Sequence, residues 1–555
     1  MRVLLVQPRS PITYWSYEQS LPFIGKSAML PPLGLITLAA HLPERWELRL
    51  RDLNLAPLAD ADLAWAEAVL LTGMLVQADS MHEVLRRARA MGRRTVVGGP
   101  AATGSPELFE EADHLFLGEA EGRLELLVRT LEAPGAAPPL RLSPGGQERP
   151  DLALARIPRF DLLEVGRYAN LALQYSRGCP FHCEFCDIVE LYGNVPRVKS
   201  PEQVVAELDA VHARGARGTL FFVDDNFVGN RREVARLLPV LQAWQERHGF
   251  PFDFLTEASV DLAIHPPLVA SMVAAGFSAV FLGIETPSSL ALSQAGKTQN
   301  LRMPQERAVE LLTRAGLEVF AGFIVGFDSD GPEIFDRQLR FISSLAIPRA
   351  MVGLLTAIPG TRLWRRLDEQ GRLRLDQPAQ GDQFTRPNFE PAMDERTLLL
   401  GYRRLLAALY DADGYYRRCA THLDQTVFRP GVVVCGSAAA GAMALVRAIW
   451  GIGLRGPRRA HFWRLLLGAL HRGRTAIARA VTLAIVGESL IRYTQEVVLP
   501  RLDRAIAALA PARQTGTVGW ATTAVAGRVD EPFAVAAVAA IRSAARPEGS
   551  TRPVP

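Results

Sequence analysis

Cysteine is scarce in this chain and is confined almost entirely to one place. The 555 residues contain five cysteines: Cys179, Cys183 and Cys186 fall within eight positions, while Cys419 and Cys435 stand apart. This distribution excludes the disulfide framework of a small secreted protein. The N-terminal MRVLLVQPRS has only a four-residue apolar run, which is too short for the core of a signal peptide. A reduced cytoplasm is therefore the expected compartment.

Long apolar runs and strong charge are also missing. The run at 431–446 is apolar but ends at Arg447, which leaves it shorter than a membrane-spanning helix. Its Gly, Ala and Ser content favours a close-packed buried helix, with peripheral membrane contact as the alternative. The formal net charge is only +4, and no cluster of arginines is interleaved with aromatic residues, so no nucleic-acid partner is expected.

The composition and length instead indicate a globular protein of several domains. Hydrophobic residues make up 48% and charged residues 22% of a chain that is too long for one ordinary core. Within 1–135, short apolar runs alternate with helical patterns, and the expected strands are 2–8, 46–54, 68–74, 94–100 and 113–121. This alternation predicts a doubly wound, Rossmann-like α/β domain. Ligands of such sheets bind beyond the carboxyl ends of the strands, where this sequence has Gly73, Gly98, Gly99 and Gly118.

A second alternating series follows a segment rich in Pro, Gly and Ala, which we interpret as a linker over 136–165. The expected strands are 171–176, 219–226, 253–259, 279–286, 318–327 and 350–360. Six strand–helix units are fewer than the eight of a closed TIM-type barrel, so 166–385 is predicted to form an open, partial (β/α)6 barrel. Amphipathic patterns predict an α-helical domain over 386–505, and the composition of 506–555 indicates a flexible tail.

The cysteine cluster, SRGCPFHCEFCDI at 176–188, directly follows one of these strands. Clustered thiolates are soft ligands that suit zinc or an iron–sulfur cluster. Structural zinc takes four ligands, and the nearest fourth candidate is His182, but the usual second pair at a distance is missing. A four-iron cluster is normally held by four cysteines, so three would leave one iron open to another ligand. The residues alone therefore do not decide between zinc and an iron–sulfur cluster.

The spacing Cys179-x-x-x-Cys183-x-x-Cys186, with the aromatic Phe185 before the last cysteine, resembles the radical S-adenosylmethionine enzymes. The resemblance implies a [4Fe-4S] cluster on these cysteines, whose free iron binds the amino and carboxylate groups of S-adenosylmethionine. Reductive cleavage of that cofactor then yields a 5′-deoxyadenosyl radical. It also implies a reducing electron donor such as flavodoxin or ferredoxin.

The same resemblance assigns cofactor contacts to other strand ends, although solvated turns or salt bridges would explain several of them equally well. The acidic motif that receives the amino group corresponds to Asp224, Asp225 and Asn226. Glu257 is expected near the ribose or methionine part, and Glu285 matches a frequent strand-end motif. The strand that backs the adenine corresponds to Gly322, Ile324 and Gly326, but Ser329 stands where the family has an acid.

The first domain resembles the cobalamin-binding subgroup of these enzymes through LPPLGLITLAA at 30–40, GGP at 98–100 and LGEAE at 117–121. The DxHxxG motif, whose histidine ligates cobalt, is absent, since His41, His82 and His114 lack its context. Either cobalamin binds without a ligand from the protein, or the domain has lost the cofactor. The four strand-end glycines would let the backbone approach a large flat ligand, yet glycine also simply turns strands.

These resemblances predict a cobalamin-dependent radical methyltransferase that acts on an unactivated carbon of a small-molecule or lipid-like substrate. The C-terminal helices resemble an extension found in the branch that includes hopanoid C-2 methylases. Two alternatives stay open: a radical oxidative cyclase or rearrangement enzyme with the same domain order, and a zinc-clipped interaction protein. The sequence assigns no catalytic residue beyond the cofactor ligands.

Overall fold

The computed structural model describes residues 1–133, 140–143, 148–374, 383–426 and 438–509, which lie in one compact unit, Met1–Leu509. Residues 510–555, most of the expected tail, lie outside the described residues, and residues 506–507 belong to a helix. Within the described ranges, no helix is both long enough and apolar enough to cross a membrane.

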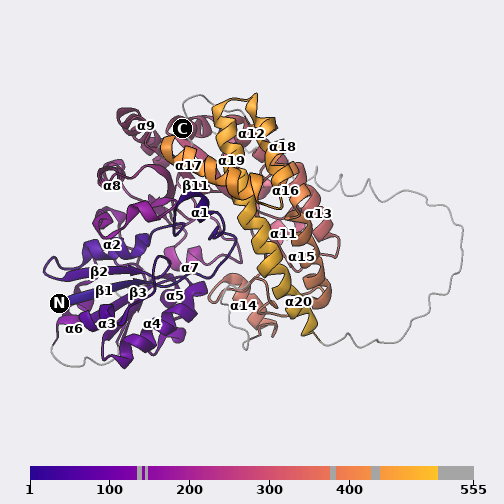
Figure 1. The fold of residues 1–555 in the computed structure, drawn as a ribbon. Helices are drawn as coiled ribbons and strands as arrows, with labels where there is room; N and C mark the ends of the chain where they lie inside the picture. The colour runs from indigo at the N-terminus through magenta and orange to yellow at the C-terminus, as the bar shows by residue number, and fades with distance from the viewer. Residues whose placement is uncertain (134–139, 144–147, 375–382, 427–437, 510–555) are drawn as a thin grey trace, which may run out of the picture. The chain divides into compact units, whose positions relative to one another are not determined.

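The first domain is a six-stranded parallel sheet in the order β2-β1-β3-β4-β5-β6 (Figure 1). Its strands are β1 (Arg2–Gln7), β2 (Glu47–Asp52), β3 (Ala68–Thr72), β4 (Arg94–Gly98), β5 (His114–Phe116) and β6 (Leu140–Leu142). Alternate residues of β1 enter different cores, Val3 and Leu5 on one face and Leu4 and Val6 on the other. Helices α2 (Leu33–His41) and α6 (Glu125–Glu132) cover the first face; α3 (Asp60–Trp65), α4 (Ala78–Ala90) and α5 (Gly99–Gly104) cover the second. The doubly wound prediction is confirmed.

The segment interpreted as a linker contributes to the folded domain. Strand β6 pairs in parallel with β5, so 140–142 extends the sheet where the sequence analysis expects no strand. Three residues between Pro- and Gly-rich stretches are too few to give a periodic signal. Further along the same segment, Phe160 and Leu163 are buried in the core that they share with the barrel.

The second domain is an open sheet of six parallel strands in the order β14-β13-β12-β11-β10-β7. The strands are β7 (Leu171–Leu173), β10 (Gly218–Phe222), β11 (Phe252–Ala258), β12 (Phe277–Glu285), β13 (Glu318–Val325) and β14 (Ala350–Leu354). The outer helices are α8 (Pro201–Ala213), α9 (Arg231–His248), α10 (Pro266–Ala274), α12 (Gln305–Ala315) and α13 (Ile334–Ser344). Strands β7 and β14 form the two edges, so the sheet is a partial barrel, as predicted.

The strand expected over 171–176 is shorter in the structure. It ends at Leu173, and β8 (Ser176–Arg177) turns aside to pair antiparallel with β9 (Arg197–Val198). The cysteine loop and the short helix α7 (Ile188–Tyr192) lie between β8 and β9. This two-stranded ribbon fixes both ends of the loop.

The C-terminal region is helical and packs along the barrel (Figure 1). It comprises α15 (Glu395–Leu409), α16 (Ala412–Gln425), α17 (Ala438–Ala448), the π-helix η8 (Ile449–Leu454), α18 (Arg459–Leu470), α19 (Arg474–Tyr493), the π-helix η9 (Thr494–Val498) and α20 (Leu499–Ala507). Barrel residues and buried residues of these helices belong to one continuous core. Helices α15 and α16 are separate, because Asp411 caps a new start by accepting the N–H of Gly414.

The expectation of a buried helix over 431–446 is wrong for its described part. Residues 431–437 lie outside the described residues, and α17 exposes Met443 and Val446 to solvent. Small residues let a helix pack closely but do not bury its other face. Among the described residues, α17 packs through one face, against α1 (Leu21–Ile24) and α19.

Candidate functional site

The cysteine loop is held by the backbone at both ends. The N–H of Cys179 donates to the carbonyl of Gly193 over 3.2 Å, and the N–H of Glu184 donates to Ala295 over 2.9 Å. Gly178 has a φ of +93°, and a Cβ there would lie 2.8 Å from the Gly193 carbonyl oxygen. Only glycine fits this conformation and this close approach.

Hydrogen-bond donors surround the three thiols. The Asn226 side-chain amide donates to the Cys179 sulfur over 3.8 Å, and the Gln299 amide donates to the Cys183 sulfur over 3.6 Å. Burial raises the pKa of the Cys179 and Cys186 thiols, while backbone N–H groups oppose that shift. Donors aimed at buried sulfurs stabilise bound thiolates, which fits an iron–sulfur cluster.

A cation lies beside the thiols. The Lys297 ammonium contacts Glu285 Oε1 over 2.6 Å. Burial alone would lower the pKa of Lys297, but Glu285 and the thiols of Cys183 and Cys186 raise it. Across the described ranges, no three His, Cys, Asp or Glu side chains lie close enough together to hold a single metal ion.

The predicted acidic motif, which follows β10, accepts hydrogen bonds from the backbone at the start of the cysteine loop. Asp224 is buried and accepts backbone N–H groups from Tyr175, over 3.3 Å, and from Ser176. Asp225 accepts the N–H of Gly178 over 3.1 Å. Burial raises the pKa of Asp224 to about 7 and that of Asp225 to about 6. Both carboxylates therefore orient the start of the loop.

Glu257 and Glu285, the two predicted glutamates, differ in their surroundings. Glu257, near the end of β11, has no hydrogen-bond or ion-pair partner for its carboxylate among the described residues. Burial, helped by Asp225 and Asp224, raises its pKa to about 8. Glu285 ends β12 at a register shift with a φ of +67° and is paired with Lys297. Only Glu257 therefore keeps an unused carboxylate.

The predicted adenine-backing strand is β13. Gly322 and Ile324 line a cavity, and a Cβ on Gly322 would lie 2.9 Å from the Phe281 ring. Gly326, with a φ of +102°, starts the turn after the strand. Asp330 accepts the N–H of Gly326 over 2.9 Å, whereas the buried Ser329 hydroxyl has no partner within the described part of the chain. Asp330 therefore stabilises the turn that follows the strand.

That cavity, of about 750 Å³, lies where the sheet domain meets the barrel. Its wall combines the ends of β13 and β14, residues 27–32, and a loop at 9–18. Much of the lining is apolar or aromatic: Tyr14, Trp15, Met29, Leu30, Met74, Phe185, Phe323, Met351 and Phe384. The volume is typical of a site for a small molecule.

A second cavity, of about 440 Å³, opens at the carboxyl ends of β3, β4 and β5 and is lined by Gly73, Gly98, Gly99 and Gly118. A Cβ on Gly99 would overlap the Thr72 hydroxyl, one on Gly73 would lie 2.8 Å from the Met81 sulfur, and one on Gly98 would lie 3.1 Å from the Phe116 carbonyl. Packing within the domain therefore accounts for Gly99 and disfavours a larger residue at Gly73 and Gly98. A Cβ on Gly118, which has a φ of +90°, would meet open space.

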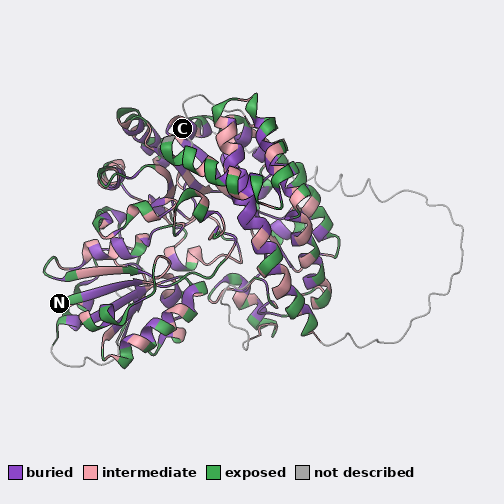
Figure 2. Ribbon diagram, viewed as in Figure 1, coloured by how far each residue is buried: buried purple, intermediate pink, exposed green. Residues whose placement is uncertain are grey.

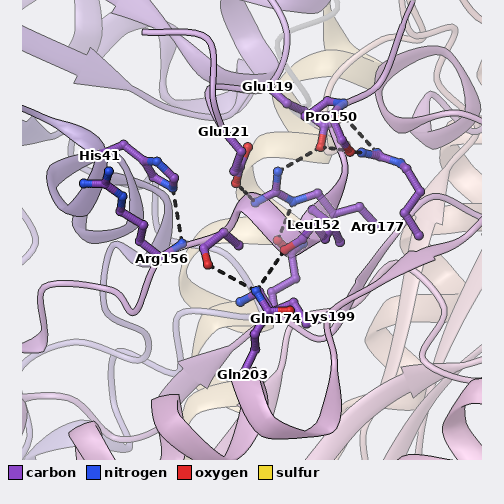
Figure 3. Close-up of polar contacts among 12 residues, drawn as sticks. His41, Glu119, Glu121, Pro150, Leu152, Arg156, Gln174, Arg177, Lys199 and Gln203 are labelled. Carbon is purple, nitrogen blue, oxygen red and sulfur yellow. Dashed lines mark hydrogen bonds and ion pairs between the residues drawn. The ribbon is translucent and has the colours of Figure 1, made fainter.

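An ion network that sequence analysis missed joins the two domains beside this cavity (Figure 3). Arg177 donates to Glu119 over 2.8 Å and to Glu121 over 2.6 Å, and Arg197 donates to Glu119 over 2.8 Å. Arg177 holds the pKa of Glu121 at about 2, although burial alone would raise it. The available signal was the acid pair of LGEAE together with an arginine two residues before the first clustered cysteine.

A trio of thiols at the mouth of a partial barrel, facing a sheet domain with its own strand-end cavity, defines a class: a radical enzyme with two cofactor domains. Comparison with known families agrees. The Radical SAM superfamily matches residues 173–342, the B12 binding domain matches 27–128, and a domain of unknown function, DUF4070, matches 361–500.

Similar proteins extend the match over most of the chain. An uncharacterized methyltransferase of Synechocystis is 41% identical over 500 residues, which cover 89% of this chain and 92% of that protein. Hopanoid C-2 methylase of Rhodopseudomonas palustris is 34% identical over 502 residues, covering 89% and 94%. The chain therefore belongs to the radical S-adenosylmethionine enzymes that carry a B12-binding domain, and it acts as a methyltransferase.

Solved structures share the fold. The cobalamin-dependent S-adenosylmethionine radical enzyme OxsB, with aqua-cobalamin and S-adenosylmethionine bound, gives a TM-score of 0.58 at 16% identity and covers 91% of this chain and 83% of its own. The methyltransferase TsrM of Kitasatospora setae gives 0.57 at 16% identity, covering 83% and 99%. The predicted family, fold class and cofactor set of [4Fe-4S] cluster, S-adenosylmethionine and cobalamin are confirmed.

Proposed function

We propose that this enzyme methylates an unactivated carbon of a lipid-like substrate, using a [4Fe-4S] cluster on Cys179, Cys183 and Cys186. The observation that carries the proposal is the largely apolar cavity of about 750 Å³ between the barrel and the sheet domain. It touches Phe185 of the cysteine loop and Gln7, Asn54 and Met74 at strand ends of the cobalamin domain. A substrate bound in this cavity would lie beside both the cysteine loop and the cobalamin domain.

When bound, the cluster would supply the electron that cleaves S-adenosylmethionine to methionine and a 5′-deoxyadenosyl radical, this radical would take a hydrogen atom from the substrate carbon, and methylcobalamin would supply the methyl group for that carbon. The protein's own part is to bind and orient these groups and to exclude water. Asn226 and Gln299 donate to cluster-binding sulfurs, and Lys297 balances the charge of the thiolates.

The S-adenosylmethionine site that we propose uses the strand ends unequally. Glu257 accepts hydrogen bonds from the ribose or the amino group, because its carboxylate has no protein partner in the described residues. Gly322 and Ile324 of β13 back the adenine. Asp224 and Asp225 act on the cofactor indirectly, by holding the cysteine loop through backbone amides.

For cobalamin we propose binding in the cavity of about 440 Å³ without a histidine ligand to cobalt. Of the histidines in the described chain, His41 lines this cavity, but its Nε2 accepts the N–H of Arg156 over 3.4 Å. His82 pairs with Glu111, and His114 is buried within β5. This arrangement supports the first of the two options left by the missing DxHxxG motif.

A lipid-like substrate is supported by the aromatic lining of the larger cavity and by the relative that is named hopanoid C-2 methylase. The proposed partners are that substrate, a reducing electron donor such as flavodoxin or ferredoxin, and a membrane at the protein's periphery. The proposed compartment is the cytoplasm.

The test is anaerobic reconstitution with iron, sulfide and cobalamin, followed by assays for 5′-deoxyadenosine, bound corrin and a product heavier by one CH₂ group. Cys183→Ala should lose the brown cluster and all cleavage of S-adenosylmethionine. Cys419→Ala, at a buried cysteine in α16 outside the loop, is the matched control and should keep both. A colourless protein that contains zinc and no iron would contradict the proposal and favour the interaction protein.

The oxidative cyclase that the sequence left open is the weaker alternative: the anaerobic magnesium-protoporphyrin IX monomethyl ester cyclase of Rubrivivax gelatinosus is 24% identical over 301 residues, only half of this chain. Its product would lose hydrogen and gain no carbon, so mass spectrometry of the product separates the two reactions.

A further inference from the structure

An exposed apolar stripe runs along α17 and the π-helix η8. Met443, Val446, Trp450 and Leu454 follow one another at spacings of three, four and four residues, so they share one helical face. Their exposed fractions are 50%, 59%, 53% and 54%. Single exposed apolar residues are normal, but four large ones in a row form a patch that marks an interaction surface. Figure 2 colours much of α17 as exposed.

The stripe lies in the most basic part of the chain. Between Asp424 and Glu488 the sequence has nine arginines and no Asp or Glu, although the whole chain carries a net charge of only +4. Arg458, Arg472 and Arg479 are paired with Glu488, Asp424 and Glu318. Arg447 and Arg455, which flank the stripe, have no carboxylate within ion-pair distance in the described ranges, and Arg455 lies 4.1 Å from the Trp450 ring centroid.

The same helix adjoins the wall of the larger cavity. Helix α17 packs against α1, where Arg447 donates to the Phe23 carbonyl over 3.4 Å. Leu21, at the start of α1, lines the cavity of about 750 Å³. The stripe is therefore connected to the proposed substrate site through one short helix.

We propose that this stripe docks on the surface of an anionic membrane, with α17 and η8 lying in the plane of the interface. An apolar face with a central tryptophan and flanking arginines has the composition of such interfacial helices. Anionic lipid headgroups complement a segment that has arginines and no acids. A symmetric dimer through the stripe would instead bring Arg447 and Arg455 of both copies together.

This inference deepens the proposed function, since a lipid-like substrate would enter from that membrane, but its test does not depend on methyl transfer. The full-length protein is sedimented with vesicles of phosphatidylcholine alone and of phosphatidylcholine mixed with phosphatidylglycerol. We expect binding to the mixed vesicles, weakening as salt is added, and much weaker binding to the neutral ones. The variant M443S/V446S/W450S/L454S should lose at least tenfold in vesicle affinity while keeping its thermal midpoint.

Two further variants separate the causes. Arg447→Gln with Arg455→Gln should weaken binding to the mixed vesicles about 25-fold at low salt, because each basic residue near the surface contributes roughly fivefold. The control L126S/L290S removes two comparably exposed leucines from the sheet domain and the barrel and should bind like the parent.

Equal vesicle binding by the parent and the serine variant would overturn the proposal, as would failure of the parent to bind. Dimerisation that disappears in the serine variant would overturn it in favour of a second copy. If vesicle binding behaves as expected while no methylated product forms with any substrate tested, the proposed function fails and the docking surface stands.

Discussion

At the scale of single residues, four acids of the candidate site are hydrogen-bonded or ion-paired to other groups of the protein, and a fifth has no such partner among the described residues. Asp224 and Asp225 accept backbone amides, Glu285 pairs with Lys297, and Asp330 caps a turn. Glu257 alone among these five carboxylates has no partner in the described part of the chain, and its pKa is raised to about 8. A half-buried acid with a raised pKa and no protein partner is typical of a ligand site.

We therefore predict opposite effects of Glu257→Gln on function and stability. The KM for S-adenosylmethionine should rise by roughly tenfold, because an amide replaces the carboxyl group that hydrogen-bonds to the cofactor, while the iron content stays unchanged. The folded-state pKa lies above the unfolded value, so the native protein holds a proton that the unfolded chain releases, and its stability falls as pH rises from about 4.5 to about 8. The cofactor-free variant should consequently melt at a higher temperature than the parent at pH 9 and at the same temperature at pH 4.

The matched control is Glu306→Gln, which changes an exposed glutamate of α12 and should alter neither quantity. An unchanged KM in the Glu257 variant would remove this residue from the proposed cofactor site.

His422 in α16 should make stability depend on pH in the opposite direction. Burial, with a contribution from Arg349, lowers its pKa to about 4. As pH falls below about 6.5, this histidine binds a proton in the unfolded chain but not in the native protein. The free energy of unfolding of the parent should therefore be about 2 kcal/mol lower at pH 5 than at pH 8 because of this residue. Urea denaturation at both values should show that difference shrinking in His422→Gln. In the control His471→Gln, at an exposed position, the full difference should remain.

At the scale of elements, the C-terminal helices hold the loop that lines the larger cavity. The Tyr493 hydroxyl donates to the Ile12 carbonyl over 2.8 Å, and the Tyr14 hydroxyl shares a hydrogen bond of 2.7 Å with Thr494. Further along, the Ser20 hydroxyl donates to the Ile485 carbonyl over 2.9 Å. Helix α19 and η9 therefore anchor both ends of residues 12–20. This contact gives a physical role to a region that matches a domain of unknown function.

Removing one anchor should loosen the loop without unfolding the protein. Tyr493→Phe deletes the hydrogen bond to Ile12, at a cost of about 1 kcal/mol in stability. We expect a higher KM for the methyl acceptor and more 5′-deoxyadenosine formed per methylated product, because a poorly positioned acceptor leaves the radical to take its hydrogen atom from other C–H groups or from the reductant. Tyr416→Phe is the matched control, since the buried Tyr416 hydroxyl has no partner in the described part of the chain. An equal ratio of 5′-deoxyadenosine to methylated product in both variants would contradict the anchoring role.

The sequence predicted the strands better than it predicted their surroundings. Buried parallel strands such as β3 and β13 read as continuous apolar runs, so both sheets could be recognised in advance. Strand β6 was hidden by neighbouring Pro and Gly, and the solvent-facing side of α17 could not be inferred from small residues that pack equally well anywhere. In the site, the three cysteines were assigned as cluster ligands through the resemblance of their spacing to that of radical S-adenosylmethionine enzymes. The partners of Asp224 were not, because the Tyr175 and Ser176 amides reach it only through the turn between β7 and β8.

At the scale of the whole molecule, the two cofactor domains are joined by a buried ion network. Arg177 leaves the barrel one residue before Gly178 and reaches Glu119 and Glu121 at the carboxyl end of the sheet. These residues also line the cavity of about 440 Å³. The network thus links the start of the cysteine loop to the proposed cobalamin site. A substitution in one site should therefore alter ligand binding in the other.

Replacing the cation of this network tests that link. Arg177→Met leaves Glu121 buried without its partner, which should cost about 3 to 5 kcal/mol in the free energy of unfolding, whereas Glu119 keeps Arg197. Adding Glu121→Gln to that variant should recover most of the loss, because the uncompensated charge is gone. The rescued double variant should fold with a full cluster yet bind less corrin than the parent, since only the Arg197–Glu119 pair then holds residues 119–121 against the barrel. Stability losses that simply add in the double variant, together with normal corrin binding, would show that the two domains are coupled by packing alone.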